Sequence, residues 1–315
     1  MPITLSDIQA AHDRIRPHIH RTPVLTSVSI DVLAGCEVYF KCENFQKIGA
    51  FKIRGGMNAA LQLPPETVKN GIATHSSGNH AQAVAFAARQ MGVPAYIVMP
   101  STSPKVKVAA VQGYGGQITF CEPNQAAREA TLEEICRKTG AAFIHPYDND
   151  HVIAGQATCA KELIEDTPGL EVVIAPVGGG GLMSGTALIT HYLLPQAQVW
   201  AGEPEGAADA VLSFRTGKVE KAPFVLPIAD GLMTALSERT LAIIREHVNE
   251  IITVSEEEIK AALRLVYERL KIVVEPSCVV PLAALLKRRD EFAGKKVGII
   301  LTGGNVDLGK MGEWF

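Results

Sequence analysis

Short apolar runs alternate along the chain with longer segments in which apolar residues recur with a helical period. The apolar runs are rich in β-branched and aromatic side chains and end at glycine, proline or polar residues, which is typical of buried strands. They predict strands at 24–27, 37–43, 71–77, 95–100, 117–122, 141–146, 171–177, 198–204, 251–255 and 296–302. The helical period predicts helices at 7–15, 29–33, 53–63, 81–92, 103–112, 124–139, 153–165, from about 183, at 241–247, at 256–269 and up to 289.

Strands and helices alternate most regularly between residues 71 and 148. This alternation predicts a parallel sheet covered by helices, and hence an α/β fold. In such sheets the loops at the carboxyl ends of the strands collect ligands. Ser6 and Ser255 are predicted to cap the helices that follow them. The segment 206–236 carries Pro223 and Pro227 and is predicted to be rich in loops that determine specificity.

Composition narrows the class of protein. The chain has 315 residues, 47% of them hydrophobic and 20% charged, which is typical of a soluble globular protein with room for two lobes. The net charge of −3, without a long run of one sign, argues against nucleic acid or a membrane as partner. Six cysteines without a CxxC pair, and no leader or long apolar run, predict a cytoplasmic protein with reduced thiols.

The stretch FKCENFQKIGAFKIRGGMN (40–58) is the first candidate for chemistry, with Lys52 at its centre. A lysine amine condenses with a carbonyl group if its neutral form is accessible. Gly49 on one side and Gly55-Gly56 on the other allow tight backbone and close approach of a ligand. The alternative from these residues alone is a solvated charge that opens an amphipathic helix.

A second candidate is the GGGG loop, which follows a predicted buried strand and precedes a helix. Its backbone N–H groups and the helix N-terminus suit a phosphate group. The loop consists of Gly178, Gly179, Gly180 and Gly181. A tight structural turn is one alternative. A dinucleotide-dependent oxidoreductase is another, although the spacing GGGGxxxG differs from GxGxxG, because Glu203 lies about as far on as the acidic residue of that motif.

Four segments in this order resemble the fold-type II pyridoxal-phosphate (PLP) enzymes, especially the branch of serine racemases and serine/threonine dehydratases. They are the Lys52 stretch, SSGNH (76–80), GGGG (178–181) and LTGGN (301–305). The resemblance extends from about Ile8 to Leu308 and implies a fold similar to the tryptophan synthase β-subunit. It implies two lobes, each with a twisted, mostly parallel sheet covered by helices. The large lobe would comprise 1–70 and 149–315, the small lobe 71–148, with the site between them, and the family suggests a homodimer.

The resemblance also implies how the cofactor is held. Lys52 resembles the Schiff-base lysine, which also removes the α-proton of an amino acid. Phe51 would lie against the cofactor ring, Asn79 would bond the ring hydroxyl, and the glycine loop would hold the phosphate. Thr302 matches the hydroxyl that meets the pyridine nitrogen. A hydroxyl does not favour a protonated ring nitrogen, which favours elimination over transamination. A turn former at the end of a strand is the alternative for Thr302.

The SSGNH segment is predicted to bind the substrate carboxylate through N–H groups at a helix start. Its residues are Ser76, Ser77, Gly78, Asn79 and His80. Ser77 matches the racemase pattern and would act on the second face of the cofactor; its alternative is a turn hydroxyl. Arg128 matches an arginine at the mouth of the site and would bind a second substrate carboxylate; its alternative is a surface arginine.

The segment EPEGAAD matches the divalent-cation site of this branch. Its ligands would be the carboxylates of Glu203 and Asp209 and the backbone carbonyl of Ala207, which suit Mg²⁺, Mn²⁺ or Ca²⁺. Ala50 and Cys278 depart from the serine and glycine that are usual at these positions, which would reshape the pocket.

These observations predict a PLP-dependent ammonia-lyase. It would eliminate water from a β-hydroxy-α-amino acid, L-serine or L-threonine, and give a 2-oxo acid and ammonia. The alternatives within the family are a serine racemase, favoured by Ser77, and a 3-hydroxyaspartate dehydratase, favoured by Arg128. The alternatives outside it are a dinucleotide oxidoreductase and a non-catalytic binding protein on the same scaffold.

Overall fold

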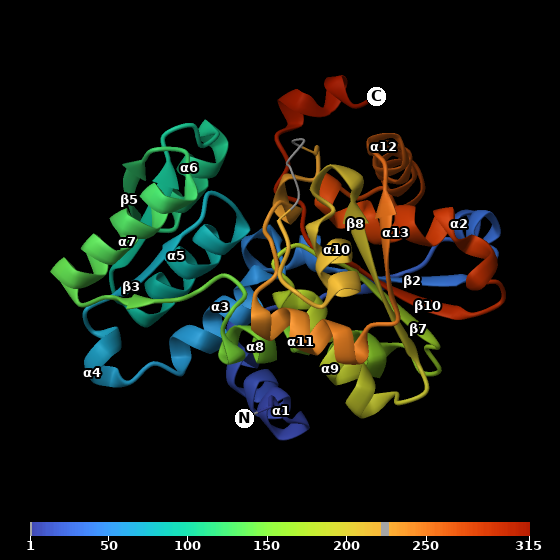
Figure 1. Ribbon diagram of the computed structural model, residues 1–315, viewed down its shortest axis with the longest axis horizontal. Helices are drawn as coiled ribbons and strands as arrows, with labels where there is room; N and C mark the ends of the chain where they lie inside the picture. The colour runs from blue at the N-terminus through green and yellow to red at the C-terminus, as the bar shows by residue number, and fades with distance from the viewer. Residues whose placement is uncertain (1, 222–226) are drawn as a thin grey trace.

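Two β-sheets organise the protein, whose computed structural model describes residues 2–221 and 227–315 (Figure 1). The first sheet has six strands in the order β1-β2-β10-β7-β8-β9, and the second has four in the order β5-β4-β3-β6. The strands are β1 (Val24–Leu25), β2 (Glu37–Cys42), β3 (Ile72–His75), β4 (Ala95–Pro100), β5 (Gly116–Cys121), β6 (Ala142–Phe143), β7 (Val172–Pro176), β8 (Gln198–Pro204), β9 (Glu250–Val254) and β10 (Lys296–Leu301). All neighbouring strands run parallel except β1, which pairs antiparallel with β2.

Helices cover both faces of both sheets. The helices are α1 (Leu5–Ile15), α2 (Val28–Ala34), α3 (Lys52–Leu61), α4 (Pro65–Val68), α5 (Asn79–Met91), α6 (Lys105–Gly113), α7 (Gln125–Thr139), α8 (Asp150–Asp166), α9 (Gly181–Leu193), α10 (Asp209–Thr216), α11 (Glu238–His247), α12 (Glu256–Leu265) and α13 (Pro276–Lys287). On the six-stranded sheet, α1, α8, α9 and α11 pack on one face, while α2, α12 and α13 pack on the other (Figure 1). On the four-stranded sheet, α7 packs on one face and α5 and α6 on the other.

The central strand β7 shows why this fold follows from the sequence. Each of its five residues is buried, because helices exclude water from both faces of a parallel sheet. The sequence accordingly gives a continuous apolar run rather than an alternating one. The predicted fold class, with two mostly parallel sheets under helices, is confirmed.

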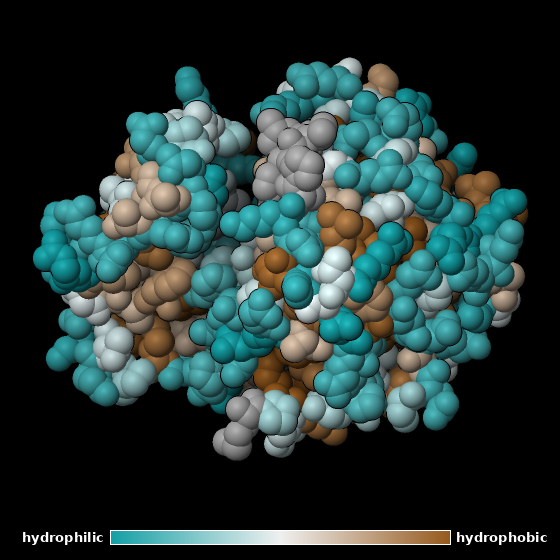
Figure 2. Space-filling model, in the orientation of Figure 1, coloured by the Kyte–Doolittle hydropathy of each residue, from teal (hydrophilic) through white to brown (hydrophobic). Residues whose placement is uncertain are grey.

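The four-stranded sheet uses only strands between residues 72 and 143. The lobe boundaries at 70 and 149 stay a prediction. The surface is hollowed between the part that carries this sheet and the rest of the molecule (Figure 2). Helix α3 leads from the six-stranded sheet toward this junction, where it packs against both α5 and α8 (Figure 1).

Several predicted helix ends need correction. Helix α1 is capped by Thr4 rather than Ser6, because the Thr4 hydroxyl accepts a hydrogen bond from the Asp7 N–H while the Asp7 carboxylate accepts one from the Thr4 N–H. Helices α5 and α9 begin two residues earlier than predicted, at Asn79 and Gly181, since each follows a glycine that turns the chain.

Two further segments differ from the sequence prediction. The helix predicted at 256–269 is α-helical to Leu265 and continues as a π-helical turn from Val266 to Leu270. The segment 206–236 contains helix α10, and its residues 222–226, with Pro223, lie outside the described residues. No helix in the described part of the chain is both long and apolar enough to cross a bilayer.

Candidate active site

Lys52 is the first residue of α3, and its side chain is part-buried. Its Nζ donates a hydrogen bond to the Pro146 carbonyl at 3.2 Å and lies 5.1 Å from the centroid of the Phe51 ring. Burial lowers the pKa of Lys52 to about 8, although the charge of Glu275 opposes this shift. A substantial neutral fraction therefore exists near neutral pH, which is what a nucleophilic or basic amine requires.

The turn after β10 holds the loop that precedes Lys52. The Phe51 N–H donates to the Thr302 carbonyl at 3.0 Å, and the Gly304 N–H donates to the Gly49 carbonyl at 2.9 Å. Ile48 has a φ of 61°, a left-handed conformation that costs a β-branched residue on the order of 1–3 kcal/mol. The bonds to the turn hold the loop in this conformation, so the position of Lys52 is tightly determined.

The predicted phosphate loop joins β7 to α9. No residue within the described ranges accepts a hydrogen bond from the backbone N–H of Gly178, Gly179, Gly180 or Gly181. A Cβ on Gly179 would lie 2.4 Å from the ring of Tyr147, so only glycine fits there. Free N–H groups at a helix start fit a phosphate group. Pro146 contacts Lys52 and the next residue, Tyr147, packs on this loop, so the structure brings the amine and the loop together.

Asn79 forms hydrogen bonds with two residues of the C-terminal part of the chain, Glu275 and Asn305. Its Nδ2 donates to Oε1 of Glu275 at 2.9 Å, and its Oδ1 accepts from Nδ2 of Asn305 at 2.8 Å. These bonds fix the orientation of the amide and leave one Nδ2 hydrogen for a further acceptor, such as the cofactor's ring oxygen. Thr302, the predicted partner of the pyridine nitrogen, is buried directly after β10.

Glu275 is a site residue that the sequence reasoning missed. Burial raises its pKa to about 7, with a smaller contribution from the charge of Asp230, while Lys107, Asn79 and Lys52 oppose the shift. Its partner Asn79 lies 196 positions away in the sequence, so no local motif links the two. The sequence does show Glu275 directly before the helix that forms α13, but this position alone predicts only a turn.

The SSGNH segment forms the loop between β3 and α5. Gly78 is the N-cap residue of α5, and its N–H donates to Oγ of Ser76 at 3.3 Å. Ser77 is half-buried in this loop. His80 is buried, with Nε2 3.0 Å from the Ile144 carbonyl, and burial together with the charge of Lys52 lowers its pKa to about 3. His80 is therefore neutral, and Nε2 carries the proton that it donates to this carbonyl.

Arg128 lies on α7, near His75 at the end of β3. Its Nε is buried without a hydrogen-bond partner in the described part of the chain. Burial lowers the pKa of His75, and the charge of Arg128 lowers it further, while Glu129 opposes the shift. Because His75 directly precedes Ser76, the guanidinium is placed beside the predicted carboxylate loop with a donor available.

His145 is a second residue that the sequence did not single out. Its Nδ1 accepts hydrogen bonds from the N–H groups of Tyr147 at 3.3 Å and Asp148 at 2.8 Å. Burial lowers its pKa to about 4. The imidazole is therefore neutral and carries its proton on Nε2. From the sequence alone, a single histidine at the end of a strand that holds a loop by hydrogen bonds cannot be distinguished from a histidine that only packs in the core.

The predicted cation site contains two buried carboxylates. Both oxygens of Glu203 accept backbone hydrogen bonds, from Ala210 at 2.7 Å and Val211 at 2.9 Å. Burial raises the pKa of Glu203 to about 8 and that of Asp209 to about 6. Neither Asp209 oxygen has a partner among the residues described, which fits a cation ligand. Those residues contain no cluster of three or more His, Cys, Asp or Glu side chains, so the rest of the shell would come from carbonyls and water.

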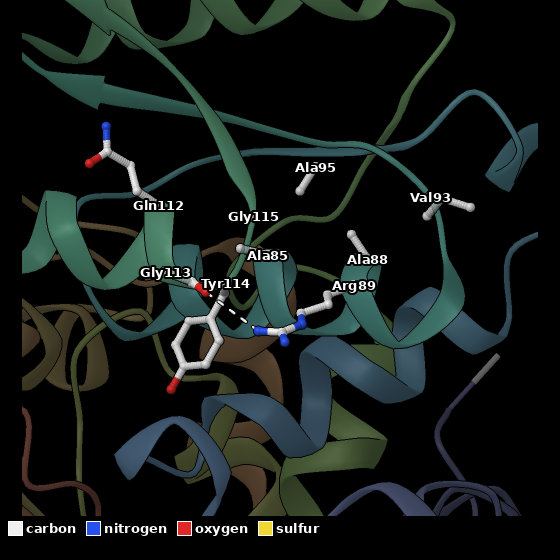
Figure 3. A pocket seen from close by; sticks show the side chains of 9 residues that line it. All are labelled: Ala85, Ala88, Arg89, Val93, Ala95, Gln112, Gly113, Tyr114 and Gly115. Atoms are coloured by element: carbon white, nitrogen blue, oxygen red, sulfur yellow. Dashed lines mark hydrogen bonds between the residues drawn. The ribbon is translucent and has the colours of Figure 1, made fainter.

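The cavity drawn in Figure 3 lies elsewhere, between α5, β4 and the turn before β5. It has a volume of about 410 Å³ and is lined mainly by alanine and glycine, with Arg89 as its one charged side chain. Arg89 donates to the Gly113 carbonyl at 3.4 Å (Figure 3). The lining holds no lysine and lies along α5 away from its N-terminus. This cavity therefore contains none of the predicted site residues.

An α/β fold with a part-buried lysine near a glycine-rich loop at a helix start is typical of enzymes that bind a phosphorylated aldehyde. Comparison with known proteins agrees, because the model of the pyridoxal-phosphate dependent enzymes matches residues 15–303. The chain belongs to this family, in its fold-type II branch.

The similar proteins include serine racemases, a β-hydroxyaspartate dehydratase and a threonine deaminase. The chain is 49% identical to the β-hydroxyaspartate dehydratase of Paracoccus denitrificans, over 98% of both chains. It is 47% identical to the serine racemase of Dictyostelium discoideum, over 99% of this chain and 97% of the other. The structure of maize serine racemase superposes with a TM-score of 0.96 at 42% identity, covering 99% of this chain and 97% of the other. The alternatives of a dinucleotide oxidoreductase and a non-catalytic protein therefore fall away.

Proposed function

We propose that the protein is a PLP-dependent ammonia-lyase that eliminates water from a β-hydroxy-α-amino acid and gives a 2-oxo acid and ammonia. The observation that carries this proposal is the amine of Lys52, whose pKa burial lowers to about 8 and which bonds Pro146, while the next residue, Tyr147, packs on the glycine loop. L-Serine, L-threonine and 3-hydroxyaspartate all have the α-hydrogen and β-hydroxyl that this reaction needs.

The family's cofactor is assigned to the residues around Lys52. Lys52 would hold the aldehyde carbon, Phe51 would lie against the ring, and Asn79 and Thr302 would bond the ring oxygen and the ring nitrogen. The loop of Gly178, Gly179, Gly180 and Gly181 would hold the phosphate. When bound, PLP withdraws electrons from the α-carbon and so acidifies the α-hydrogen. The Lys52 amine would accept this proton at Nζ, because its lowered pKa leaves the amine a base near neutral pH.

The substrate carboxylate is assigned to the loop Ser76–His80. The N–H groups of the first turn of α5 have no acceptor within their own helix, and the helix dipole favours an anion there. The neutral state of His80 fits this role, since its ring holds the Ile144 carbonyl and anchors the start of α5.

A dicarboxylic substrate, 3-hydroxyaspartate, is favoured among the three. The supporting observation is the buried Nε of Arg128, which has no partner among the residues described and lies near His75. A guanidinium binds a second carboxylate with charge-assisted hydrogen bonds that serine and threonine cannot make. The similarity to the Paracoccus dehydratase supports the same choice.

Serine racemase is the second candidate, and Ser77 is the residue that favours it. A hydroxyl on the face opposite Lys52 would exchange a proton there and allow D-serine chemistry. Ser77→Ala is then expected to spare elimination from L-serine and abolish turnover of D-serine. Equal loss on both enantiomers would defeat the role of Ser77 as a second base.

A divalent cation is assigned to Glu203, Ala207 and Asp209. The supporting observation is the buried, unpartnered carboxylate of Asp209 within the described residues, whose charge calls for a counterion. The cation would stabilise the fold beside β8, away from the reacting atoms.

A homodimer in the cytoplasm completes the proposal. Val28 and Val32 on α2 are 79% and 77% exposed, as expected for apolar residues that a second subunit covers. All six cysteines are free thiols, which fits a reducing compartment. Sedimentation of wild type and of Val28→Glu would test the dimer, since a monomeric wild type contradicts it.

One substrate panel tests the proposed activity. The holoenzyme is given L-serine, D-serine, L-threonine and the 3-hydroxyaspartate stereoisomers, and 2-oxo acid, ammonia and the inverted enantiomer are measured together. We expect 2-oxo acid from all L-configured substrates, with 3-hydroxyaspartate best. Arg128→Gln should lower kcat/KM for 3-hydroxyaspartate about 10²-fold and leave that for L-serine within about threefold, since one charged contact contributes about 1.5–3 kcal/mol. Absence of 2-oxo acid from every substrate would overturn the proposal.

A further inference from the structure

The two ends of the proposed cofactor site stand on different helices. Lys52 is the first residue of α3, and the phosphate loop ends at Gly181, the first residue of α9. A cofactor bound at both ends requires a fixed distance between these helix starts. Helix α8 lies between them and packs against both.

Helix α3 touches α8 backbone to backbone, one turn after Lys52. A Cβ on Gly155 would lie 2.6 Å from the Arg54 carbonyl oxygen and 2.7 Å from the Cα of Gly55. A Cβ on Gly55 would in turn lie 2.7 Å from the Val152 carbonyl oxygen. Only glycine at these two positions permits so close a crossing of the two backbones.

Hydrogen bonds between α3 and α8 prevent the two helices from sliding along each other. Arg54 is completely buried and donates to Oγ1 of Thr158 at 3.2 Å and to both oxygens of Glu162, at 2.9 and 2.8 Å. The Gly55 N–H donates to Oε1 of Gln156 at 3.2 Å. Bidentate bonds of a guanidinium fix direction as well as distance, so α3 is also held against rotation on α8.

Helix α9 meets the opposite side of the same stretch of α8. A Cβ on Gly185 would lie 2.7 Å from the Ile153 carbonyl oxygen and 2.7 Å from the Ala157 nitrogen. Gly185 stands four residues after Gly181, about one turn from the phosphate loop. The residues 152–158 of α8 are therefore in backbone contact with α3 on one side and α9 on the other.

We propose that this stretch of α8 is a spacer that sets the distance between the Lys52 amine and the phosphate loop, with Gly155, Gly185 and Arg54 as positioning residues. This inference rests on the proposed cofactor site. A substitution that widens the crossing of α8 with α3 or with α9 shifts the Lys52 amine relative to the phosphate loop. It leaves the residues of both binding ends unchanged. Ligands held at both ends lose affinity, and ligands held at the phosphate end alone do not.

Gly155→Ala is the sharpest variant, because relief of the 2.6 Å contact to ordinary van der Waals distance, 3.4 Å or more, moves α3 by about an ångström. A displacement of about 1 Å is enough to cost about 10²-fold where geometry is critical. Gly113→Ala is the matched control, since a Cβ on this helical glycine of α6 meets nothing within 4 Å.

The experiment compares two probes on the apoproteins by calorimetric titration. PLP engages the amine and the phosphate loop, and inorganic phosphate engages the phosphate loop alone. We expect Gly155→Ala to lose about tenfold or more in affinity for PLP and less than about twofold for inorganic phosphate. Gly113→Ala should match wild type with both.

Two further variants keep the test decisive if Gly155→Ala does not fold. Gly185→Ala shifts α9 and with it the phosphate loop. Arg54→Lys weakens the hydrogen bonds between α3 and α8 without adding atoms at the crossing. Both variants should lose affinity selectively for PLP. Equal losses for both probes, or unchanged PLP affinity with only a lower melting temperature, would overturn the spacer. Failure of wild type to bind PLP would instead overturn the proposed cofactor site, so the two failures are distinguishable.

Discussion

Lys52 and Arg54 lie two residues apart in the first turn of α3, and protein surrounds both cationic groups. Arg54 bonds Glu43 at 2.7 Å through Nε and Glu162 at 2.8 Å through Nη2, and Lys41 lies 2.8 Å from the same Glu162 carboxylate. Lys52 has one neutral partner, the Pro146 carbonyl, among the residues described. One turn of helix thus contains a fully paired cation and an almost unpaired one.

This difference decides what each residue does. The two carboxylates raise the pKa of Arg54 well above its usual value despite burial, and the same pairing lowers that of Glu162 to about 2. Burial without a strong partner lowers the pKa of Lys52 to about 8. Paired burial therefore gives permanent charges that hold elements together, while unpaired burial gives an amine that can lose its proton near neutral pH.

The largest expected effect comes from Lys52→Met. Activity should fall by about 10³-fold or more and the visible absorbance of bound PLP should disappear, because nothing else in the site supplies the amine. The free energy of unfolding of the apoprotein should change by less than about 1 kcal/mol, since no ion pair is broken. Absorbance, turnover and urea unfolding of the same preparation check this prediction; retained absorbance would contradict it.

Arg54→Met should show the reverse pattern. Removal of the guanidinium leaves Glu43 and Glu162 buried without their main partner, which destabilises a protein by about 3–5 kcal/mol. Urea unfolding measures the loss. Arg21→Met is the matched control, because Arg21 pairs with Glu165 and Asp166 of the same helix α8 at the surface and should cost less than about 1 kcal/mol. Equal costs for the two variants would refute the distinction between buried and exposed pairs.

The reactivity of the Lys52 amine should follow its lowered pKa. Only the neutral amine reacts, so the rate at which the apoprotein's Lys52 is acylated should rise with pH and reach half its maximum near pH 8. A hydrated lysine reaches this point near about pH 10.4. Exposed Lys69 serves as the internal comparison. Competitive labelling with peptide mass spectrometry gives the pH profile of acylation for both lysines. If the two profiles coincide, the pKa of Lys52 is not lowered and the contrast with Arg54 fails.

The smallest effect concerns Asp209, a buried anion without a partner in the described ranges. Its raised pKa means that the fold disfavours the charged form, so this residue lowers stability as pH rises from about 4 to its folded pKa of about 6, and the loss is constant at higher pH. At pH 7.5 without divalent cation, Asp209→Asn should gain about 1 kcal/mol over wild type, and the gain should vanish near pH 4. Calcium should raise the melting temperature of wild type alone; an equal rise in the variant would exclude Asp209 as a ligand.

The sequence predicted the parts of the fold and site that leave local patterns. Apolar runs located the strands, and the strand-loop-helix succession marked the Lys52, SSGNH and GGGG loops. It could not predict Glu275 or His145, because their partners come from distant segments or from the backbone of a loop. It also placed the cap of α1 at Ser6 instead of Thr4, since a side-chain hydroxyl two residues from the true cap gives the same local signal.

The clearest test of the account is chemical trapping of the cofactor on its lysine. The holoprotein is reduced with sodium borohydride, digested, and mapped for a phosphopyridoxyl group by mass spectrometry. The account predicts one modified site, on the peptide that contains Lys52, in stoichiometric yield. A phosphopyridoxyl group on another lysine, or none on a protein that turns over substrate, would contradict it.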